Sequence, residues 1–92
     1  MKKLKSAKTL LKDAKWFDDC KVCQSPINGG DIRFGTERQY VSLKMPPSAQ
    51  TKTEETAEML NSMMRFVFEK HSKTLKKEAE EILKTITVET ND

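Results

Sequence analysis

Two cysteines three positions apart are the residues of this 92-residue chain whose type and spacing most readily predict chemistry. The spacing of Cys20 and Cys23 allows two thiolates to bind one tetrahedral zinc ion. Such an ion takes four protein ligands, and the only other Cys or His in the chain is His71. Zinc therefore requires Asp18, Asp19 or His71 nearby, or a second copy of the chain that contributes its own pair.

Two structural thiols and a redox pair are the other interpretations of this motif. A redox pair lies at a helix N-terminus, which lowers the pKa of the first thiol. Here the pair follows a helical stretch, and Pro26 disfavours helical conformation at Ser25. Structural thiols are therefore preferred, zinc is kept as an alternative cofactor, and redox chemistry is the weakest interpretation.

The remaining titratable residues do not predict an enzyme. His71 falls within an apolar stripe, which is typical of a core or interface histidine rather than a ligand or catalyst. The carboxylates lie on helix faces at ion-pair spacing, and no arrangement of Ser, His and Asp indicates a nucleophile. We therefore expect a protein that binds rather than one that catalyses.

A run without Pro or Gly, residues 51–86, predicts one long helix around which the chain is organised. Thr51 with Glu54 matches a capping box, and Pro46-Pro47 prevents an earlier start, so the helix is expected to begin near Thr51 or Thr53. One face carries an apolar stripe at helical spacing. Its members are Ala57, Leu60, Met64, Val67, Phe68, His71, Leu75, Ala79, Ile82 and Ile86.

A second apolar set, Met59, Met63 and Phe66, projects from another side of the same helix. The chain's own β-hairpin could cover it. Alternatively it is a surface for a protein partner, since flexible Met side chains favour adaptable interfaces. Trp16 has the same two interpretations, packing on the following loop or anchoring an interface.

Residues 3–17 predict an amphipathic first helix, within an N-terminal segment 1–17, that carries most of the positive charge. Lys5, Lys8, Lys12 and Lys15 form a ridge beside its apolar arc. Such a ridge fits a phosphate backbone or an acidic protein face, or is a solvated surface kept for solubility.

Residues 31–45 alternate in polarity and predict a two-stranded β-hairpin. Val41, Leu43 and Met45 lie on the side expected to cover the start of the long helix. The opposite face carries the basic and aromatic residues, which could hold a phosphate or a stacked base or simply be polar. These are Arg33, Arg38, Tyr40 and Lys44.

Together these segments predict one small α+β domain with an N-terminal helix, a β-hairpin and a long C-terminal helix packed on the hairpin. The expected order is helix 1–17, CxxC loop 18–30, hairpin 31–45, linker 46–50, helix 51–86, and a tail 87–92 that is frayed or forms a short edge strand. A chain of this length buries only a modest core, so a homodimer or a metal ion that stabilises the fold is expected.

The formal net charge of +3 is too small to identify a nucleic-acid binder by itself. No secretory signal and no membrane-spanning run are recognised, so we expect a cytoplasmic protein. The preferred function is a small regulator or inhibitor, of the kind common in phages and mobile elements, that binds a larger host or cellular protein. The alternatives are a nucleic-acid or nucleotide-phosphate binder using the lysine ridge and the Arg/Lys hairpin face and, more weakly, a zinc-linked dimer.

Overall fold

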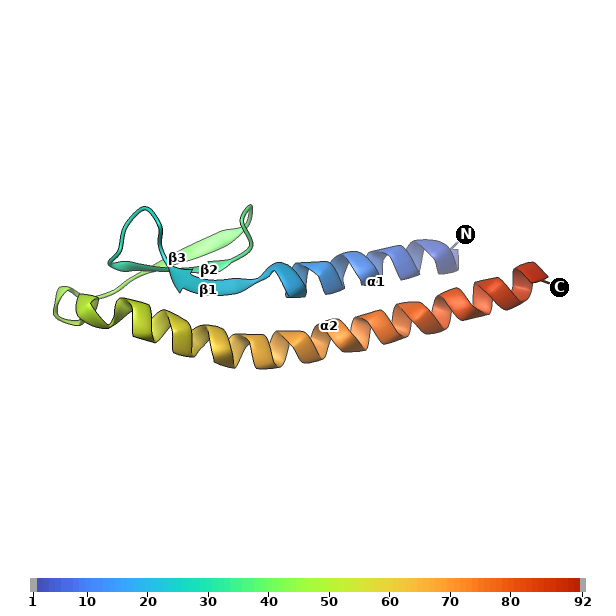
Figure 1. The fold of residues 1–92 in the computed structure, drawn as a ribbon. Coiled ribbons are helices and arrows are strands. Elements are labelled where there is room, and N and C mark those ends of the chain that lie inside the picture. The colour runs from blue at the N-terminus through green and yellow to red at the C-terminus, as the bar shows by residue number, and fades with distance from the viewer. Residues whose placement is uncertain (1, 92) are drawn as a thin grey trace. The chain divides into compact units, whose positions relative to one another are not determined.

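The fold is a mixed α+β arrangement, as predicted. In chain order, an N-terminal helix is followed by a three-stranded antiparallel sheet and then by a long C-terminal helix. A computed structural model describes the backbone of residues 2–91 and the side chains of residues 5–85. In chain order the elements are α1 (Lys2–Asp19), β1 (Lys21–Gln24), β2 (Asp31–Gly35), β3 (Tyr40–Lys44), the 3₁₀ helix η1 (Pro47–Lys52) and α2 (Thr53–Asn91) (Figure 1).

Two compact units make up the chain, and each is described by itself. The helical unit combines residues Met1–Asp18 with Glu69–Asp92, and the sheet unit comprises Asp19–Phe68. The long helix α2 contributes its first part to the sheet unit and its second part to the helical unit.

The predicted β-hairpin is present as β2 and β3, but the sheet has a third strand that was not predicted, in the order β1-β2-β3. The added strand β1 lies within the segment 18–30 that was predicted to be a loop. Val22 in β1 lies opposite Phe34 in β2, which lies opposite Val41 in β3. Four residues are too few to show a two-residue period in the sequence, and β1 is defined by its hydrogen bonds to β2.

The long helix begins at one of its two expected positions and ends later than expected. Most of the predicted linker 46–50 belongs to η1, and α2 begins at Thr53. The Thr53 hydroxyl donates a hydrogen bond of 2.8 Å to the Gln50 carbonyl, which joins the two helical segments. At the other end α2 continues through the predicted tail to Asn91. The side chain of Ile86 and those of the predicted tail lie outside the described residues.

Short polar side chains shape the turn between β1 and β2. The Ser25 hydroxyl oxygen accepts hydrogen bonds from the Ile27 and Asn28 N–H groups, and Asn28 Oδ1 accepts one from the Gly30 N–H. Such local bonds are the reason that Ser and Asn favour turns. These bonds close the β1–β2 hairpin at Asn28-Gly29-Gly30.

Gly35 ends β2 with a backbone conformation that other residues rarely adopt. Its φ is 136°, and a Cβ atom there would lie 2.3 Å from the Gln39 carbonyl oxygen. Only glycine fits this position without strain. The tight turn between β2 and β3 therefore depends on Gly35.

The core of the sheet unit lies between α2 and the sheet face that carries Val22 and Ile32 (Figure 1). From α2, Ala57 and Met64 complete this core, and Met45 and Phe68 pack against it partly buried. The rings of Phe34 and Phe68 meet edge to face with centroids 6.3 Å apart.

Two side chains of α2 form hydrogen bonds with the backbone of β1 and of the residue just before it, Cys20. Asn61 Oδ1 accepts a bond of 2.9 Å from the Val22 N–H, and Arg65 Nη1 donates one of 3.1 Å to the Cys20 carbonyl. Asn61 and Arg65 are four positions apart and share one side of the helix. The outer edge of β1 is therefore held by α2.

In the helical unit, α1 and the second part of α2 meet through small residues. Ala7 and Ala14 of α1 and Ala79 of α2 are fully buried. Small side chains let two helix backbones approach closely. A 2.8 Å ion pair between Lys76 and Asp18, with both side chains partly exposed, lies on the surface of this unit.

His71 was expected in a core or interface stripe, but its side chain is exposed in the structure. The imidazole lies beside the Phe17 ring, with centroids 5.4 Å apart. The core interpretation of His71 was therefore wrong, because helical spacing gives the side of a helix and not how far a neighbouring element reaches over it.

We expect Asn61→Ala to lower the free energy of unfolding by roughly 1–2 kcal/mol, because the partly buried Val22 N–H loses its acceptor. Denaturant unfolding followed by circular dichroism measures this change. Ser62→Ala, at the next and exposed position of the helix, is the control and should change it by less than about 0.5 kcal/mol. Equal stability of the two variants would contradict this role of Asn61.

Candidate protein-interaction surface

Three large apolar side chains lie on one side of α2 with most of their surface exposed. Met59, Met63 and Phe66 are 63%, 67% and 76% exposed, respectively. Their spacing of four and three residues places them in one row along the helix. We call this row the α2 apolar face; the β-hairpin that could have covered it does not do so.

Apolar surface continues from the α2 apolar face toward the sheet. Leu60 and Val67 lie between this row and the buried core residue Met64, at helical spacing. Their side chains are 39% and 46% exposed, whereas Met64 is 8% exposed. The exposed fraction thus rises steadily around α2, away from the side that packs against the sheet.

The face of β3 that carries Val41 and Leu43 is also exposed. This differs from the expectation that these residues cover the long helix. Cross-strand partners share a face of a sheet, so Val41 lies on the same face as Phe34, and Leu43 on the same face as Ile32. Ile32 is 1% exposed, but Val41 and Leu43 are 67% and 60% exposed. The helix therefore covers the sheet on the β1 side and leaves β3 open.

Sequence reasoning missed Val41, Leu43, Leu60 and Val67 as surface residues. Their apolar character and spacing are the same as those of core residues. The lengths of the hairpin strands were the only available signal for these residues. They do not indicate that a third strand, β1, lies over α2 in place of β3.

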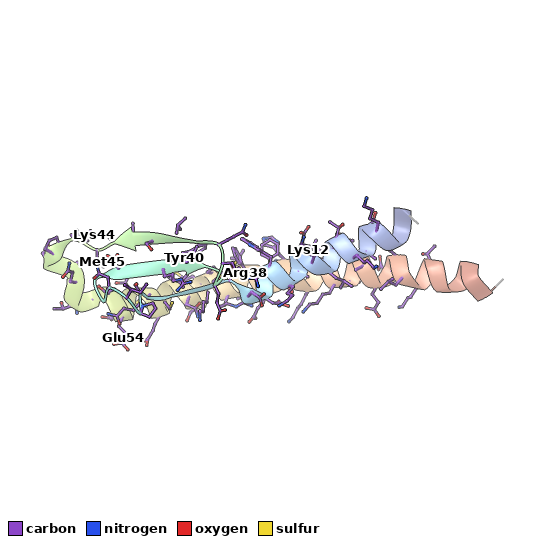
Figure 2. The ribbon with its side chains drawn as sticks, turned by 90° about the horizontal axis from the view of Figure 1, so that it is seen from above. Lys12, Arg38, Tyr40, Lys44, Met45 and Glu54 are labelled. Atoms are coloured by element: carbon purple, nitrogen blue, oxygen red, sulfur yellow. The ribbon has the colours of Figure 1, made fainter. Side chains whose placement is uncertain are left out.

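The predicted anion-binding residues of the hairpin do not gather at one point. The Arg33 guanidinium stacks on the Tyr40 ring at 3.6 Å from its centroid, and Arg33 Nη2 donates to the Glu37 carbonyl. Arg38 lies at the turn end of the hairpin and Lys44 at the opposite end (Figure 2). Arg33 is therefore already engaged by its own hairpin.

A pocket on the sheet face opposite the core lies beside Arg33. It is lined by Lys21, Cys23, Pro26, Arg33, Gly35, Thr36 and Glu37. One carboxylate and two cationic side chains border it, so it does not form a strongly positive anion site.

The lysine ridge of the first helix is exposed as expected. Lys5, Lys8, Lys12 and Lys15 all have exposed side chains on α1. They belong to the helical unit, whereas Arg33, Arg38 and Lys44 belong to the sheet unit.

Trp16 also lies in the helical unit. The residue is 41% exposed, and its indole ring meets the Phe17 ring edge to face with centroids 5.2 Å apart. Trp16 therefore packs on its sequence neighbour and still presents surface to solvent. Its role as an interface anchor stays a prediction.

The two cysteines lie in different surroundings and are not joined by a disulfide. Cys20 is buried in the core with Val22, whereas Cys23, the next residue after Val22, is directed to the opposite face of the sheet. Burial raises the pKa of the Cys20 thiol, and the nearby Arg65 guanidinium partly offsets this effect. The Cys20 thiol thus packs as a small apolar group.

Among the described residues, no three His, Cys, Asp or Glu side chains lie close enough to hold a metal ion. A zinc ion bound by both thiols would require Cys20 to leave the core. Zinc stays a prediction, and thiol reactivity tests it.

We expect a thiol reagent such as Ellman's reagent to modify Cys23 of the native protein quickly and Cys20 only slowly. Burial limits access to Cys20, and its raised pKa reduces its thiolate fraction until the pH is more alkaline. Cys23→Ser should leave only the slow phase. In the wild type, denaturant should make both thiols react quickly. If both thiols instead react slowly and a chelator accelerates both, the zinc interpretation is correct.

No helix in the described part of the chain combines the length and the apolar character needed to cross a membrane. Comparison of the chain with protein-family models, with curated proteins and with solved structures gave no match. Any functional proposal therefore depends on the surfaces described above.

Proposed function

We propose that this protein is a non-enzymatic binding protein that docks a larger protein partner on the α2 apolar face. The observation that carries this proposal is the exposure of Met59, Met63 and Phe66 in one row. Large apolar side chains that are grouped and exposed are typical of an interaction site, whereas single ones are common on any surface.

Burial of this row would contribute a substantial part of the free energy of binding. Complete burial of a large apolar side chain contributes roughly 1.5–3 kcal/mol, so three such side chains are a substantial part of a micromolar affinity. Two of the three are Met, whose flexible side chains adapt to the shape of a partner. A partner with an apolar groove that accepts one side of a helix fits this surface.

A regulator or inhibitor acts in this way, by occupying part of the surface of a larger protein. We place this activity in the cytoplasm, because two free cysteines are compatible with a reducing compartment. A phage or mobile-element origin stays an expectation from size and composition.

We expect Phe66→Glu to abolish capture of the partner while the fold is retained. A carboxylate on this row cannot be buried in an apolar groove without a large desolvation cost, yet the Phe66 side chain contributes little to the core because it is 76% exposed. The measurement is affinity capture from the source cells, followed by calorimetry with the purified candidate partner. Wild-type binding should show a negative heat-capacity change.

Gln39→Glu is the matched control, because it adds one carboxylate at an exposed position of the β2–β3 turn. It should bind as the wild type does, and both variants should have wild-type circular dichroism and thermal unfolding. Retained binding by Phe66→Glu would contradict the proposal. So would unfolding of that variant, since Phe66 would then be a core residue.

Binding of a polyanion by the lysine ridge is the second candidate function. It is favoured by the exposure of Lys5, Lys8 and Lys12 along one side of α1. Salt dependence distinguishes it from protein docking, because neutralisation of phosphates releases counterions.

If the ridge binds nucleic acid, fluorescence anisotropy with a labelled duplex should show an affinity that falls steeply between about 50 and 200 mM salt. Lys8→Glu combined with Lys12→Glu should remove this binding, whereas Phe66→Glu should leave it unchanged. A complex whose affinity does not change with salt, and that survives the double substitution, would exclude the ridge.

A further inference from the structure

The ladder between β2 and β3 decides which backbone groups of β3 remain free. Just beyond the strands, the Met45 N–H donates a 3.0 Å bond to the Gly30 carbonyl, and hydrogen-bonded pairs alternate from there. Val41 and Leu43 therefore direct their N–H and C=O groups toward β2. The outer edge of β3 presents the backbone groups of Tyr40, Ser42 and Lys44, which have no hydrogen-bond partner in the described part of the chain.

The two edges of the sheet differ in this respect. At the β1 edge, Asn61 accepts from the Val22 N–H and Arg65 donates to the Cys20 carbonyl. No comparable side chain covers the β3 edge among the described residues. Proteins generally protect exposed edges by bulges, prolines or inward charges, and β3 is a regular five-residue strand with one Lys at its end.

Beside the free edge, β3 also has a free apolar face. Val41 and Leu43 are 67% and 60% exposed on the side of the sheet that faces α2. An edge with unpaired backbone groups and adjacent apolar side chains is suited to pairing with another strand.

We propose that β3 pairs antiparallel with β3 of a second copy of this chain, about a two-fold axis at Ser42. The two sheets then join into one six-stranded sheet. Ser42 lies opposite Ser42 of the second copy, and Val41 lies opposite Leu43. Because the Ser42 backbone points outward, the two Ser42 residues exchange both N–H···O=C bonds, and Tyr40 does the same with Lys44 of the second copy.

The residues of β3 are complementary to those of a second copy of β3 in this register. All five residues of each strand are paired, and the apolar pair of Val41 and Leu43 occurs twice on the same face. On the other face, Lys44 lies opposite Tyr40 of the second copy; the Arg33 guanidinium already occupies one side of that ring, so Lys44 can approach only the other side. No like charges lie opposite each other.

The neighbouring registers are worse. A two-fold axis at Val41 would place Arg38 opposite Lys44, which is a repulsive pair. An axis at Leu43 would place Tyr40 opposite Pro46, which has no N–H to donate. A register that paired an outward-pointing residue with an inward-pointing one cannot form a regular ladder.

A pair of five-residue strands is about 17 Å long, so the contact is at the small end of specific interfaces. We therefore expect a reversible dimer with a dissociation constant on the order of micromolar. The pairing uses β3 and not the α2 apolar face, so it goes beyond the function proposed above and can fail independently of it.

Ser42→Pro tests the pairing directly. The Ser42 N–H points away from β2, so proline removes a bond to the second copy but none within the chain. Analytical ultracentrifugation of the full chain, from about 1 to about 300 µM, should show a dimer for the wild type and at least a tenfold larger dissociation constant for Ser42→Pro. Ser42→Ala, which keeps the N–H, should dimerise as the wild type does.

Thermal unfolding at low concentration, where all variants are monomers, must be alike for Ser42→Pro and Ser42→Ala. If proline disturbs the monomer, Ser42→Cys gives an independent test. A wild type that stays monomeric throughout the concentration range overturns the proposal. A Ser42→Pro variant that is folded and dimerises as tightly as the wild type also overturns it.

The register is tested by disulfide formation in a Cys23→Ser background, in which Cys20 is buried. Hydrogen-bonded antiparallel partners have Cα atoms about 5.5 Å apart, within the range for a disulfide. Ser42→Cys should therefore form a cross-linked dimer on mild oxidation. Tyr40→Cys should not, because the two copies of residue 40 would lie about 14 Å apart. Equal cross-linking of both variants, or of neither, would overturn the register.

Discussion

The hydrogen bonds from α2 to β1 determine which parts of this protein are covered and which are open. Asn61 and Arg65 hold the backbone at Val22 and Cys20, so the helix lies against the β1 side of the sheet. One helix, about 10–12 Å wide, does not cover the full width of three strands, which is about 14 Å at a spacing of about 4.8 Å. The third strand is consequently left without a layer beneath it.

This off-centre packing explains the gradient of exposure in the sheet unit. Val22 and Ile32 are buried, while Val41 and Leu43, on the same face, are largely exposed. Around α2 the same gradient leads from Met64 through Leu60 to the α2 apolar face. The apolar residues that do not reach the core thus form surfaces on two elements, and each surface has its own proposed partner.

The spacing of the two cysteines predicts shared chemistry, but the fold places the two thiols in different surroundings. In the sequence, Cys20 and Cys23 have the spacing of a zinc or redox pair. In the structure, Cys20 lies just before β1 and Cys23 within it, and successive residues of an extended segment point to opposite faces. Cys20 is therefore a core residue and Cys23 a surface residue, so their shared chemistry would require a different local structure.

Periodicity alone determined several features of this protein: the α+β class, the long helix, the amphipathic first helix with its lysine ridge, and the separate row of Met59, Met63 and Phe66 on α2. Local hydrogen-bonding chemistry also determined the turn at Asn28, since Ser and Asn bond to nearby backbone groups wherever the chain allows a turn.

Only the tertiary structure decided that Lys21–Gln24 is a strand, that Val41 and Leu43 are exposed, and that the edge of β3 is free. These features depend on which strand lies over α2. That choice is made by contacts between residues about forty positions apart, such as Val22 with Asn61. Sequence patterns report which side of an element is apolar, but the extent of its cover is a property of the packed neighbours.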